Sequence, residues 1–452
     1  MSLPTRRRFL SAAAAALALA LDRRASALGR TPLGGRLSFH VPWPTGALDP
    51  HDLHDPLAAL FAAAVVDPVY ALDAAGLPYP ALAAGMPVHE GGETLIRLRE
   101  GLRTARLLAL DARDLIFSVE RARARGAVAV LADIPRPTPH KGDPLAVSFG
   151  NVDPQRLARA LASPLVALVP RRFSPAAPDG TGAFHAQASP AGLLLTRNLL
   201  AARGASYLDA VEVLPAEDLK SSLRAFEAER DDLGWLGLGL HDPRAGAVRF
   251  DLGRAAWIVL VTGPDSGASG VPGAAQRLVD AIPPERLAHL GLGPLPPATG
   301  DPAWGGPPAE LLVDEASPHL LEVARAVAPV LSTPGHEVTV TPVPRDVLRR
   351  RLKGKPALAV DVVRPVGPHA QHTLMALATA EDAGRGRDVA RTPPHLSPGA
   401  GARTLTSLLR VGVLGDLRVA GGMMPELSLA RSASGEGWDL GATFHKPPKR
   451  PL

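Results

Sequence analysis

The chain has 452 residues, with 44 glycines, 47 prolines, no cysteine and a formal net charge of +5. A chain of this length is expected to form two or three domains, and its 46% hydrophobic and 21% charged residues are typical of a globular protein rather than a collagen or a coiled coil. The lack of cysteine excludes thiol catalysis, iron–sulfur clusters, cysteine-ligated zinc and a cysteine-linked lipid anchor.

The first 27 residues have the pattern of an export signal. The basic residues Arg6–Arg8 precede an apolar run over 9–21, and the small residues Ala25–Ala27 follow. This order is typical of a secretory signal peptide, and two arginines followed at a fixed distance by Phe-Leu resemble the twin-arginine type. An ordinary secretory signal with a chance arginine pair is the alternative. In both cases we expect residues 1–27 to be removed and the mature protein to be periplasmic.

Removal of residues 1–27 changes the charge of the protein. The segment holds five arginines and one aspartate, so the remainder carries a net charge of +1. A nearly neutral chain is not expected to seek nucleic acid. No other apolar stretch reaches 18 residues, so we expect no membrane span in the mature chain.

Alternating apolar and polar residues predict that the mature chain opens with a strand over 34–41. A turn-rich loop at 48–51 follows, and then a helix over 56–64. A second helix is expected after Asp111, an aspartate suited to cap it, with Gly126 as its end. Further elements predicted in this half are a strand and turn over 70–76, strands over 94–99, 145–149, 165–169, 192–197 and 210–214, and helices over 153–161 and 216–230, followed by an apolar stretch over 232–236.

The second half has a clearer α/β rhythm. An apolar strand over 257–262 precedes a stretch rich in Gly and Pro, 263–308, with one helix near 274–281. Alternation of strands and helices then indicates a mixed sheet with helices on its faces. We expect a flexible connection over 383–402. The other predicted elements are strands over 311–313, 336–340, 358–363, 411–414 and 417–419, and helices over 320–331 and 346–352.

The order of short motifs resembles the family of extracellular solute-binding proteins that deliver oligopeptides, dipeptides or nickel chelates to ATP-driven importers. Each motif is weak alone, but together they follow the family's order and spacing from residue 34 to about 260. The segments that carry the resemblance are 34–37, 48–51, 72–83, 98–101, 112–121, 178–184, 195–198 and 207–211.

The resemblance implies a two-lobed α/β periplasmic binding protein fold of type II-like topology, with an extra small subdomain in the first lobe. It also implies a monomeric binding protein, not an enzyme, that needs no cofactor or metal and passes its ligand to an ABC permease of the inner membrane. The ligand would be peptide-like or of another class, such as an anion, and would lie in one cleft between 34–250 and 251–400. The implied division is lobe I over 28–55, 179–250 and 403–452, the small subdomain over 56–178, and lobe II over 251–402.

The sequence also departs from this family. It has only 18 aromatic residues where the family is rich in Trp and Tyr, and the family's Asn-Pro-x-Tyr-Trp tract is replaced by a stretch beginning at Asn198. Where peptide binders place an aspartate against the peptide's ammonium group, this chain has Arg364, which can hold a carboxylate or phosphate instead. A degenerate relative that acts as an envelope interaction or structural protein, without transport, is therefore an alternative. An exported hydrolase is a weaker one, because no nucleophile or metalloprotease motif is present.

We predict ligand contacts from tryptophans near strand ends, from polar residues of the motif loops and from Arg364. Tryptophans can wall a ligand cleft, although core packing is an equal alternative for each. The predicted ligand-binding residues are Trp43, Asp49, Trp235, Trp257, Arg364 and His369.

Three patterns have alternative interpretations. His51 and His54 with their neighbouring aspartates could hold a metal, but we favour an ordinary loop that ends in a helix cap. His369 and His372 repeat the same spacing, and we favour solvated loop residues. Gly180-Thr181-Gly182 could cradle phosphate, but it lacks the lysine of such loops, so we favour a tight turn.

Overall fold

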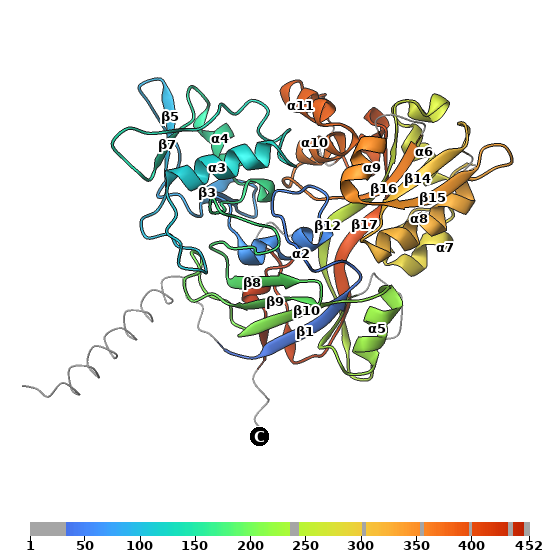
Figure 1. Cartoon of the computed structure of the whole chain (residues 1–452), viewed down its shortest axis with the longest axis horizontal. Coiled ribbons are helices and arrows are strands. Elements are labelled where there is room, and N and C mark those ends of the chain that lie inside the picture. Colours follow the sequence, from blue (N-terminus) through green and yellow to red (C-terminus); the bar gives the residue numbers. More distant parts are fainter. Residues whose placement is uncertain are drawn as a thin grey trace, which may run out of the picture.

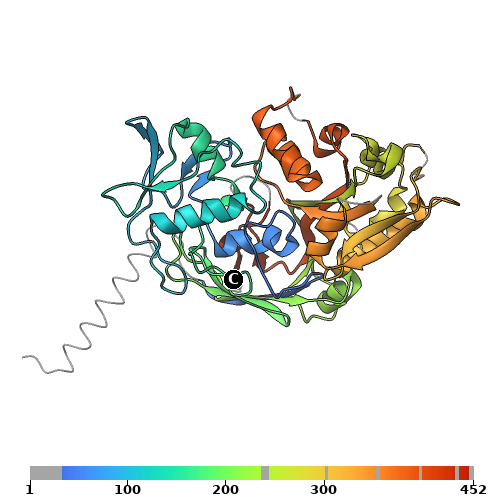
Figure 2. The same ribbon diagram turned by 45° about the horizontal axis from the view of Figure 1, so that its top comes forward.

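The computed structural model describes residues 33–235, 244–300, 304–352, 357–396, 400–432 and 437–446. The predicted export segment, 1–27, lies outside the described residues. Figures 1 and 2 show three parts packed around two long strands that cross the middle of the molecule. No helix among the described residues is long and apolar enough to cross a membrane.

A four-stranded sheet forms the base of the molecule in Figure 1. The first predicted strand pairs in parallel with a strand about 170 residues later, and the other pairs are antiparallel. Helix α2 (Pro56–Val65) lies above this sheet and begins at Asp55, whose side chain accepts hydrogen bonds from two backbone N–H groups. The strands, in spatial order, are β1 (Arg36–Val41), β10 (Ala210–Pro215), β9 (Gly192–Arg197) and β8 (Phe184–Ser189).

A smaller part is inserted between α2 and β8. Its helix α3 (Ala112–Arg123) begins with the predicted Asp111 cap, and Asp114 completes a capping box by accepting from the backbone of Asp111. The other elements are β2 (Tyr70–Leu72) paired with β3 (Pro78–Pro80), the sheet of β4 (Val88–Glu90), β5 (Glu93–Arg97), β7 (Ala146–Ser148) and β6 (Thr138–Pro139), and α4 (Pro154–Ala160).

The largest sheet is mixed, as the second half of the sequence predicted. Its parallel strands β14, β15 and β16 adjoin the antiparallel pair of long strands, β12 and β17. In spatial order the strands are β11 (Leu233–Trp235), β17 (Val411–Met423), β12 (Val248–Thr262), β16 (Ala357–Val363), β14 (Ala309–Asp314) and β15 (Val338–Val343), with β13 (Leu292–Gly293) beside β17.

Helices cover both faces of this sheet (Figure 1). One face packs α6 and α8, and the other packs α9 and α10. A short pair, β18 (Leu427–Ser428) and β19 (Phe444–His445), ends the described chain. The remaining α-helices are α5 (Leu219–Glu227), α6 (Ala274–Asp280), α7 (Pro284–Leu287), α8 (Pro318–Leu331), α9 (Arg345–Arg351), α10 (Ala370–Glu381), α11 (Ala383–Arg391) and α12 (Ala402–Leu405).

Strand β12 is buried on both sides and contributes to two hydrophobic cores. Ile258 and Leu260 join the core that contains the base sheet, α2 and α8. Trp257 and Val259, on the opposite face, join the core that contains α3, α4 and α10. Because side chains alternate along a strand, one continuous apolar run supplies both cores. Each core therefore connects the second half of the chain to the first.

One predicted strand, 165–169, is wrong. Pro164–Val166 form a 3₁₀ helix instead, and the residues that follow pair with no strand. The segment is buried, but its N–H groups bond to loops and side chains: Leu168 to the Asp67 carbonyl at 2.9 Å and Val169 to Ser118 Oγ at 2.9 Å. A short apolar run indicates burial and cannot by itself distinguish a strand from a buried loop.

Two further predictions fail near the C-terminus. The expected flexible connection over 383–402 contains helix α11, which Asp382 caps, and the start of α12. The two late strands are one strand, β17, which pairs with β12 from Val411 to Met423 with several register shifts. This pairing places β17 in the largest sheet, and the predicted division of the chain into lobes remains a prediction.

The Gly180–Gly182 segment is a tight bend against the end of α2, as favoured from the sequence. A Cβ atom at Gly182 would lie 2.5 Å from the carbonyl oxygen of Ala64, and one at Gly180 would lie 2.5 Å from that of Val65. The backbone of Gly182 also donates to Val65 at 2.9 Å. These glycines therefore allow the chain to return closely past the helix.

We predict that Gly182→Ala lowers the free energy of unfolding by about 1–3 kcal/mol, because the added methyl group meets rigid backbone. Chemical denaturation measures the difference. Gly85→Ala is the matched control, since a Cβ there meets nothing within 4 Å. Equal stability of the two variants would contradict the close packing.

Candidate functional site

The loop over Asp49–Asp55, called here the joint loop, lies where the three parts meet. Its first residue, Asp49, is held by Arg121 of α3 through two hydrogen bonds of 2.7 Å, one to each carboxylate oxygen. Arg125 adds a longer contact of 3.3 Å to the same carboxylate. A bidentate, buried pair of this kind fixes both distance and orientation. Asp49 is thus bound to the small part of the molecule.

His51 is buried and bonds to the same part. Its Nε2 lies 2.9 Å from the carbonyl oxygen of Ala167, while Nδ1 lies 2.9 Å from Arg121 Nη1. Because the guanidinium can only donate, Nδ1 must accept and the ring proton must be on Nε2. Burial, with the Arg121 charge adding to it, lowers the pKa of His51 from 6.5 to about 4. The imidazole is therefore neutral at physiological pH.

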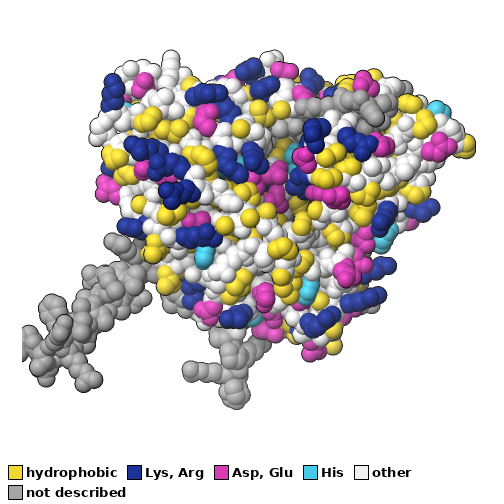
Figure 3. All heavy atoms as spheres, viewed as in Figure 1, with side chains coloured by type: hydrophobic (Ala, Val, Ile, Leu, Met, Phe, Trp, Pro, Cys, Tyr) yellow, Lys and Arg dark blue, Asp and Glu magenta, His cyan; other side chains and the backbone are white. Residues whose placement is uncertain are grey.

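The other end of the joint loop faces the largest sheet. Arg345 of α9 lies 3.4 Å from Asp52 and 2.8 Å from Asp314. His54 Nδ1 lies 2.8 Å from the carbonyl oxygen of Val362 and 3.2 Å from the carboxylate of Asp361. Figure 3 shows acidic side chains gathered in a hollow at the middle of this face, with basic side chains on both sides.

Burial also shifts the pKa values of two groups at this end. The pKa of His54 falls from 6.5 to about 4, because burial and the nearby Arg349 oppose its charge. The pKa of Asp55 rises from 3.8 to about 6, because of burial and the nearby Asp52. The carboxylate of Asp55 serves as the cap of α2, as the sequence favoured.

Arg364 is 3% exposed and contacts the joint loop. Its Nη1 donates to the carbonyl oxygens of Pro50 at 2.9 Å and Asp52 at 2.8 Å, and its backbone N–H donates to Leu53 at 2.9 Å. These contacts bind the end of β16 to the loop. The predicted contact of Arg364 with a ligand remains a prediction, and the contacts described here give the residue a structural role.

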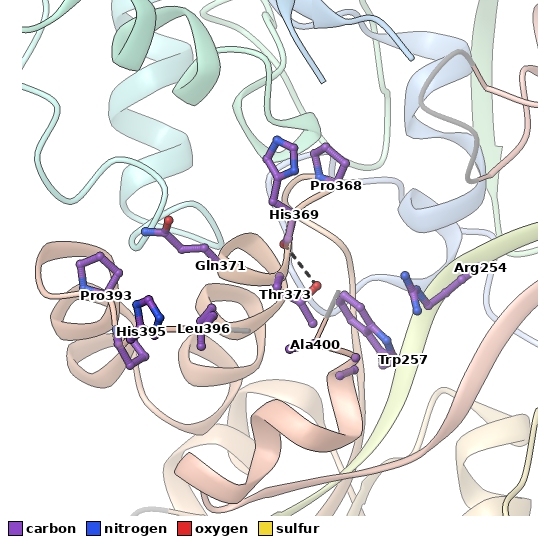
Figure 4. Close-up of a pocket in the computed structure, with 14 residues that line it drawn as sticks. Arg254, Trp257, Pro368, His369, Gln371, Thr373, Pro393, His395, Leu396 and Ala400 are labelled. Atoms are coloured by element: carbon purple, nitrogen blue, oxygen red, sulfur yellow. Dashed lines mark hydrogen bonds between the residues drawn. The ribbon is translucent and has the colours of Figure 1, made fainter. Parts of the chain in front are cut away.

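A cavity of about 760 Å³ lies between β12 and the start of α10. Its volume is within the range of about 300–1,000 Å³ typical of small-molecule sites. Figure 4 shows Arg254 and Trp257 on β12, His369 and Thr373 at the start of α10, and His395 on the following segment. The described lining residues, which contain no Asp or Glu, are Arg254, Trp257, 368–371, Thr373, 393–396 and 400–402.

The cavity differs from the predicted cleft in its position. All described lining residues belong to the second half of the chain, whereas we expected a cleft between 34–250 and 251–400. The first half approaches the cavity residue His369. There, a Cβ atom at Gly76 would lie 3.0 Å from the ring of His369. In the described conformation, the boundary between the halves is occupied by the joint loop.

The six predicted ligand-binding residues lie in different parts of the structure. Trp257 and His369 line the cavity, while Asp49 and Arg364 belong to the region of the joint loop. Trp43 is buried in the core, with its ring 5.9 Å from that of His319. The remaining residue, Trp235, ends β11 opposite Gly421.

Sequence reasoning missed Arg254. The strand predicted over 257–262 begins after Arg254, whereas β12 begins at Val248, and residues three apart point to opposite faces of a regular strand. The structure has register shifts in the β12–β17 pairing next to Arg254, and Gly253 has a φ of +98°. A glycine inside a strand pattern can mark such a bulge, and this glycine was the available signal.

Among the described residues, no group of three or more His, Asp or Glu side chains could hold a metal ion. His51 and His54 bond to different parts of the molecule. His369 and His372 stack with ring centroids 5.4 Å apart. Burial and the neighbouring His369 lower the pKa of His372 to about 4. His372 is thus a partly buried residue in the first turn of α10 and not the loop residue that the sequence suggested.

No protein-family model matches the sequence, and no curated protein matches it. Solved structures do match. The periplasmic binding protein DppA from Helicobacter pylori, in complex with the peptide STSA, matches with a TM-score of 0.66 and 13% identity over 92% of this chain and 99% of its own. The binding protein AgaA from A. tumefacien R10, in complex with agropinic acid, gives 0.67 and 14% over 91% and 99%. NikA from Brucella suis, in complex with Fe(III)-EDTA, gives 0.60 and 15% over 91% and 100%.

These similarities establish the fold. The chain has the α/β fold of the periplasmic binding proteins, over nearly its whole length. The sequence motifs resembled the oligopeptide-, dipeptide- and nickel-binding family, and the solved structures with the same fold are members of it. The predicted fold class is confirmed.

We predict that Arg364→Met lowers the free energy of unfolding by about 1–3 kcal/mol, since it leaves two buried carbonyl groups without their donor. Urea denaturation measures this change. Arg350→Met is the control, because Arg350 pairs with Asp346 at the surface, where both side chains are 74% exposed. If the two variants are equally stable, Arg364 does not hold the joint loop.

We also predict that the protein loses stability as the pH falls from about 6.5 to 4. The unfolded chain binds protons at its histidines in this range, whereas buried His51 and the partly buried His54 and His372 bind them only near pH 4. Asp55 opposes the trend between pH 6 and 3.8, because its folded form binds a proton more readily than the unfolded form.

The variant His54→Asn removes one of these groups and keeps a donor near the Nδ1 position. We expect it to reduce the slope of unfolding free energy against pH by about 1.4 kcal/mol per pH unit, the equivalent of one proton. The exposed His89, replaced by Asn, is the control. An unchanged slope in His54→Asn would show that this imidazole is protonated in the folded protein.

Proposed function

We propose that this chain is a periplasmic solute-binding protein that delivers a small ligand to an ABC permease in the inner membrane. The observation that supports this function is the fold, which the chain shares over 91–92% of its length with binding proteins solved with their ligands. A cavity of ligand size, lined by two of the predicted residues, adds to this support. Delivery would follow closure of the two lobes around the ligand and would involve no chemical reaction.

The ligand class has to be inferred from the residues of this chain, because the fold does not determine it. Neighbours with this fold are bound to a peptide, to agropinic acid and to Fe(III)-EDTA, so the fold accommodates unlike ligands. A small peptide-like molecule or an anion is consistent with the cavity volume. We retain the predicted lobes, with 251–402 as lobe II, as part of this proposal.

A second function is favoured by the joint loop. The resemblance places Arg364 where relatives contact their ligand. In this chain its Nη1 instead donates to the carbonyl oxygens of Pro50 and Asp52. A binding protein that has lost its ligand could keep such a closed, internally bonded boundary. The alternative is thus a degenerate relative that acts in the envelope as an interaction or structural protein without transport.

Native mass spectrometry of the protein released from the periplasm of its own host distinguishes the two functions. We expect a monomer that lacks residues 1–27 and carries a small molecule, which dissociates on activation and can be identified. A chain that is consistently empty, while its host retains a normal uptake profile after deletion of the gene, would support the envelope role and contradict transport.

A further inference from the structure

We propose that the cavity between β12 and α10 selects a small organic anion, a carboxylate with an apolar body, and that Arg254 is the residue that selects it. The inference rests on the proposed binding function and specifies its ligand class. Three observations support it: the charge of the lining, the buried indole N–H of Trp257 and the apolar residues of the remaining wall.

Among the described lining residues of the cavity, the charged side chain is that of Arg254. The described lining holds the guanidinium of Arg254 and two imidazoles, from His369 and His395, and it holds no carboxylate. Helix α10, of 12 residues, begins at the same wall, and Ala370 and Gln371 of its first turn line the cavity. The first N–H groups of a helix have no partner within the helix and carry a partial positive charge. This environment favours an anion over an ammonium group.

Trp257 supplies an independent observation. Its side chain is 1% exposed and lines the cavity, yet its indole N–H has no hydrogen-bond partner among the described residues. A buried donor without an acceptor destabilises a protein by about 1–3 kcal/mol. A ligand oxygen that reached this N–H would provide the acceptor that the donor lacks, whereas an ammonium group would not.

Arg254 is already positioned beside this donor. Its guanidinium carbon lies 4.6 Å from the centre of the Trp257 ring, a stacked cation–π arrangement that Figure 4 shows at one side of the cavity. Its Nη1 lies 3.7 Å from the Asp416 carboxylate, which Arg418 also approaches at 3.7 Å. Two arginines thus share one carboxylate, while Arg418 has a closer partner in Asp251 at 2.7 Å.

The remaining wall is apolar and indicates an organic ligand rather than an inorganic ion. Pro368, Pro393, Pro394 and Leu396 contribute to it, together with the face of Trp257. A volume of about 760 Å³ is far larger than a phosphate or sulfate ion requires. An anionic group near Arg254 and an apolar body against the prolines and Leu396 fit this distribution.

The test uses three probes of nearly equal size: benzoate, benzamide and benzylamine, which are anionic, neutral and cationic at pH 7. We expect isothermal titration calorimetry on the intact mature protein to show benzoate binding at least tenfold more tightly than the other two. Arg254→Met should weaken benzoate at least tenfold and leave benzamide unchanged. Arg254→Lys should retain part of the preference, and Trp257→Phe, which removes only the donor, should weaken benzoate severalfold.

The exposed Arg350→Met variant is the matched control for lost positive charge, and we expect it to bind benzoate like the original protein. Thermal melting of each variant verifies that it is folded. Equal binding of the three probes, no binding of benzoate, or unchanged benzoate affinity in folded Arg254→Met would overturn the inference. A cationic or neutral molecule identified by native mass spectrometry would overturn it too, but would leave the proposed binding function intact.

Discussion

The structure depends on charge pairs made by two residues of the joint loop, a largely buried pair at Asp49 and a partly exposed pair at Asp52. Asp49 accepts two hydrogen bonds from Arg121, and Asp52, three positions later, shares Arg345 with Asp314. A buried charge without its partner is strongly destabilising, so the elements that carry these partners cannot separate freely. Helix α3 and helix α9 are thereby both bound to the same short loop, through Asp49 and Asp52. The two hydrophobic cores lie on either side of this loop.

Much of the fold could be predicted because its elements are locally consistent. The alternation of β1, the aspartate caps of α2 and α3 and the α/β rhythm of 309–363 all lie in short stretches of sequence. The predictions that failed concern segments whose conformation depends on tertiary contacts. Residues 165–169 are as apolar as a strand, but Ser118 and Asp67 satisfy their N–H groups, and no pattern within the segment contains that information. Likewise β17 continues through Gly415 because β12 lies beside it.

The site was less predictable than the fold. Trp257 and His369 were chosen from the sequence and line the cavity, whereas Arg254 requires an irregularity in β12 that brings it to the side of Trp257. Arg364 was placed by analogy with a family position, and the structure shows its side chain bonded within its own chain. Motif order locates a segment along the chain. It does not determine which neighbour a side chain meets, since that depends on contacts hundreds of residues apart.

The burial of β12 on both faces makes the unfolded chain prone to aggregation during synthesis. Residues 255–262 are eight consecutive buried residues without charge or proline, a composition that favours intermolecular β-pairing when it is exposed. Covering this strand requires packing from both halves of the chain, so it stays vulnerable until synthesis is nearly complete. If the leader is of the twin-arginine type, which exports folded proteins, the strand would cross the membrane already shielded. Export in the folded state would then keep β12 covered by both cores and prevent its aggregation.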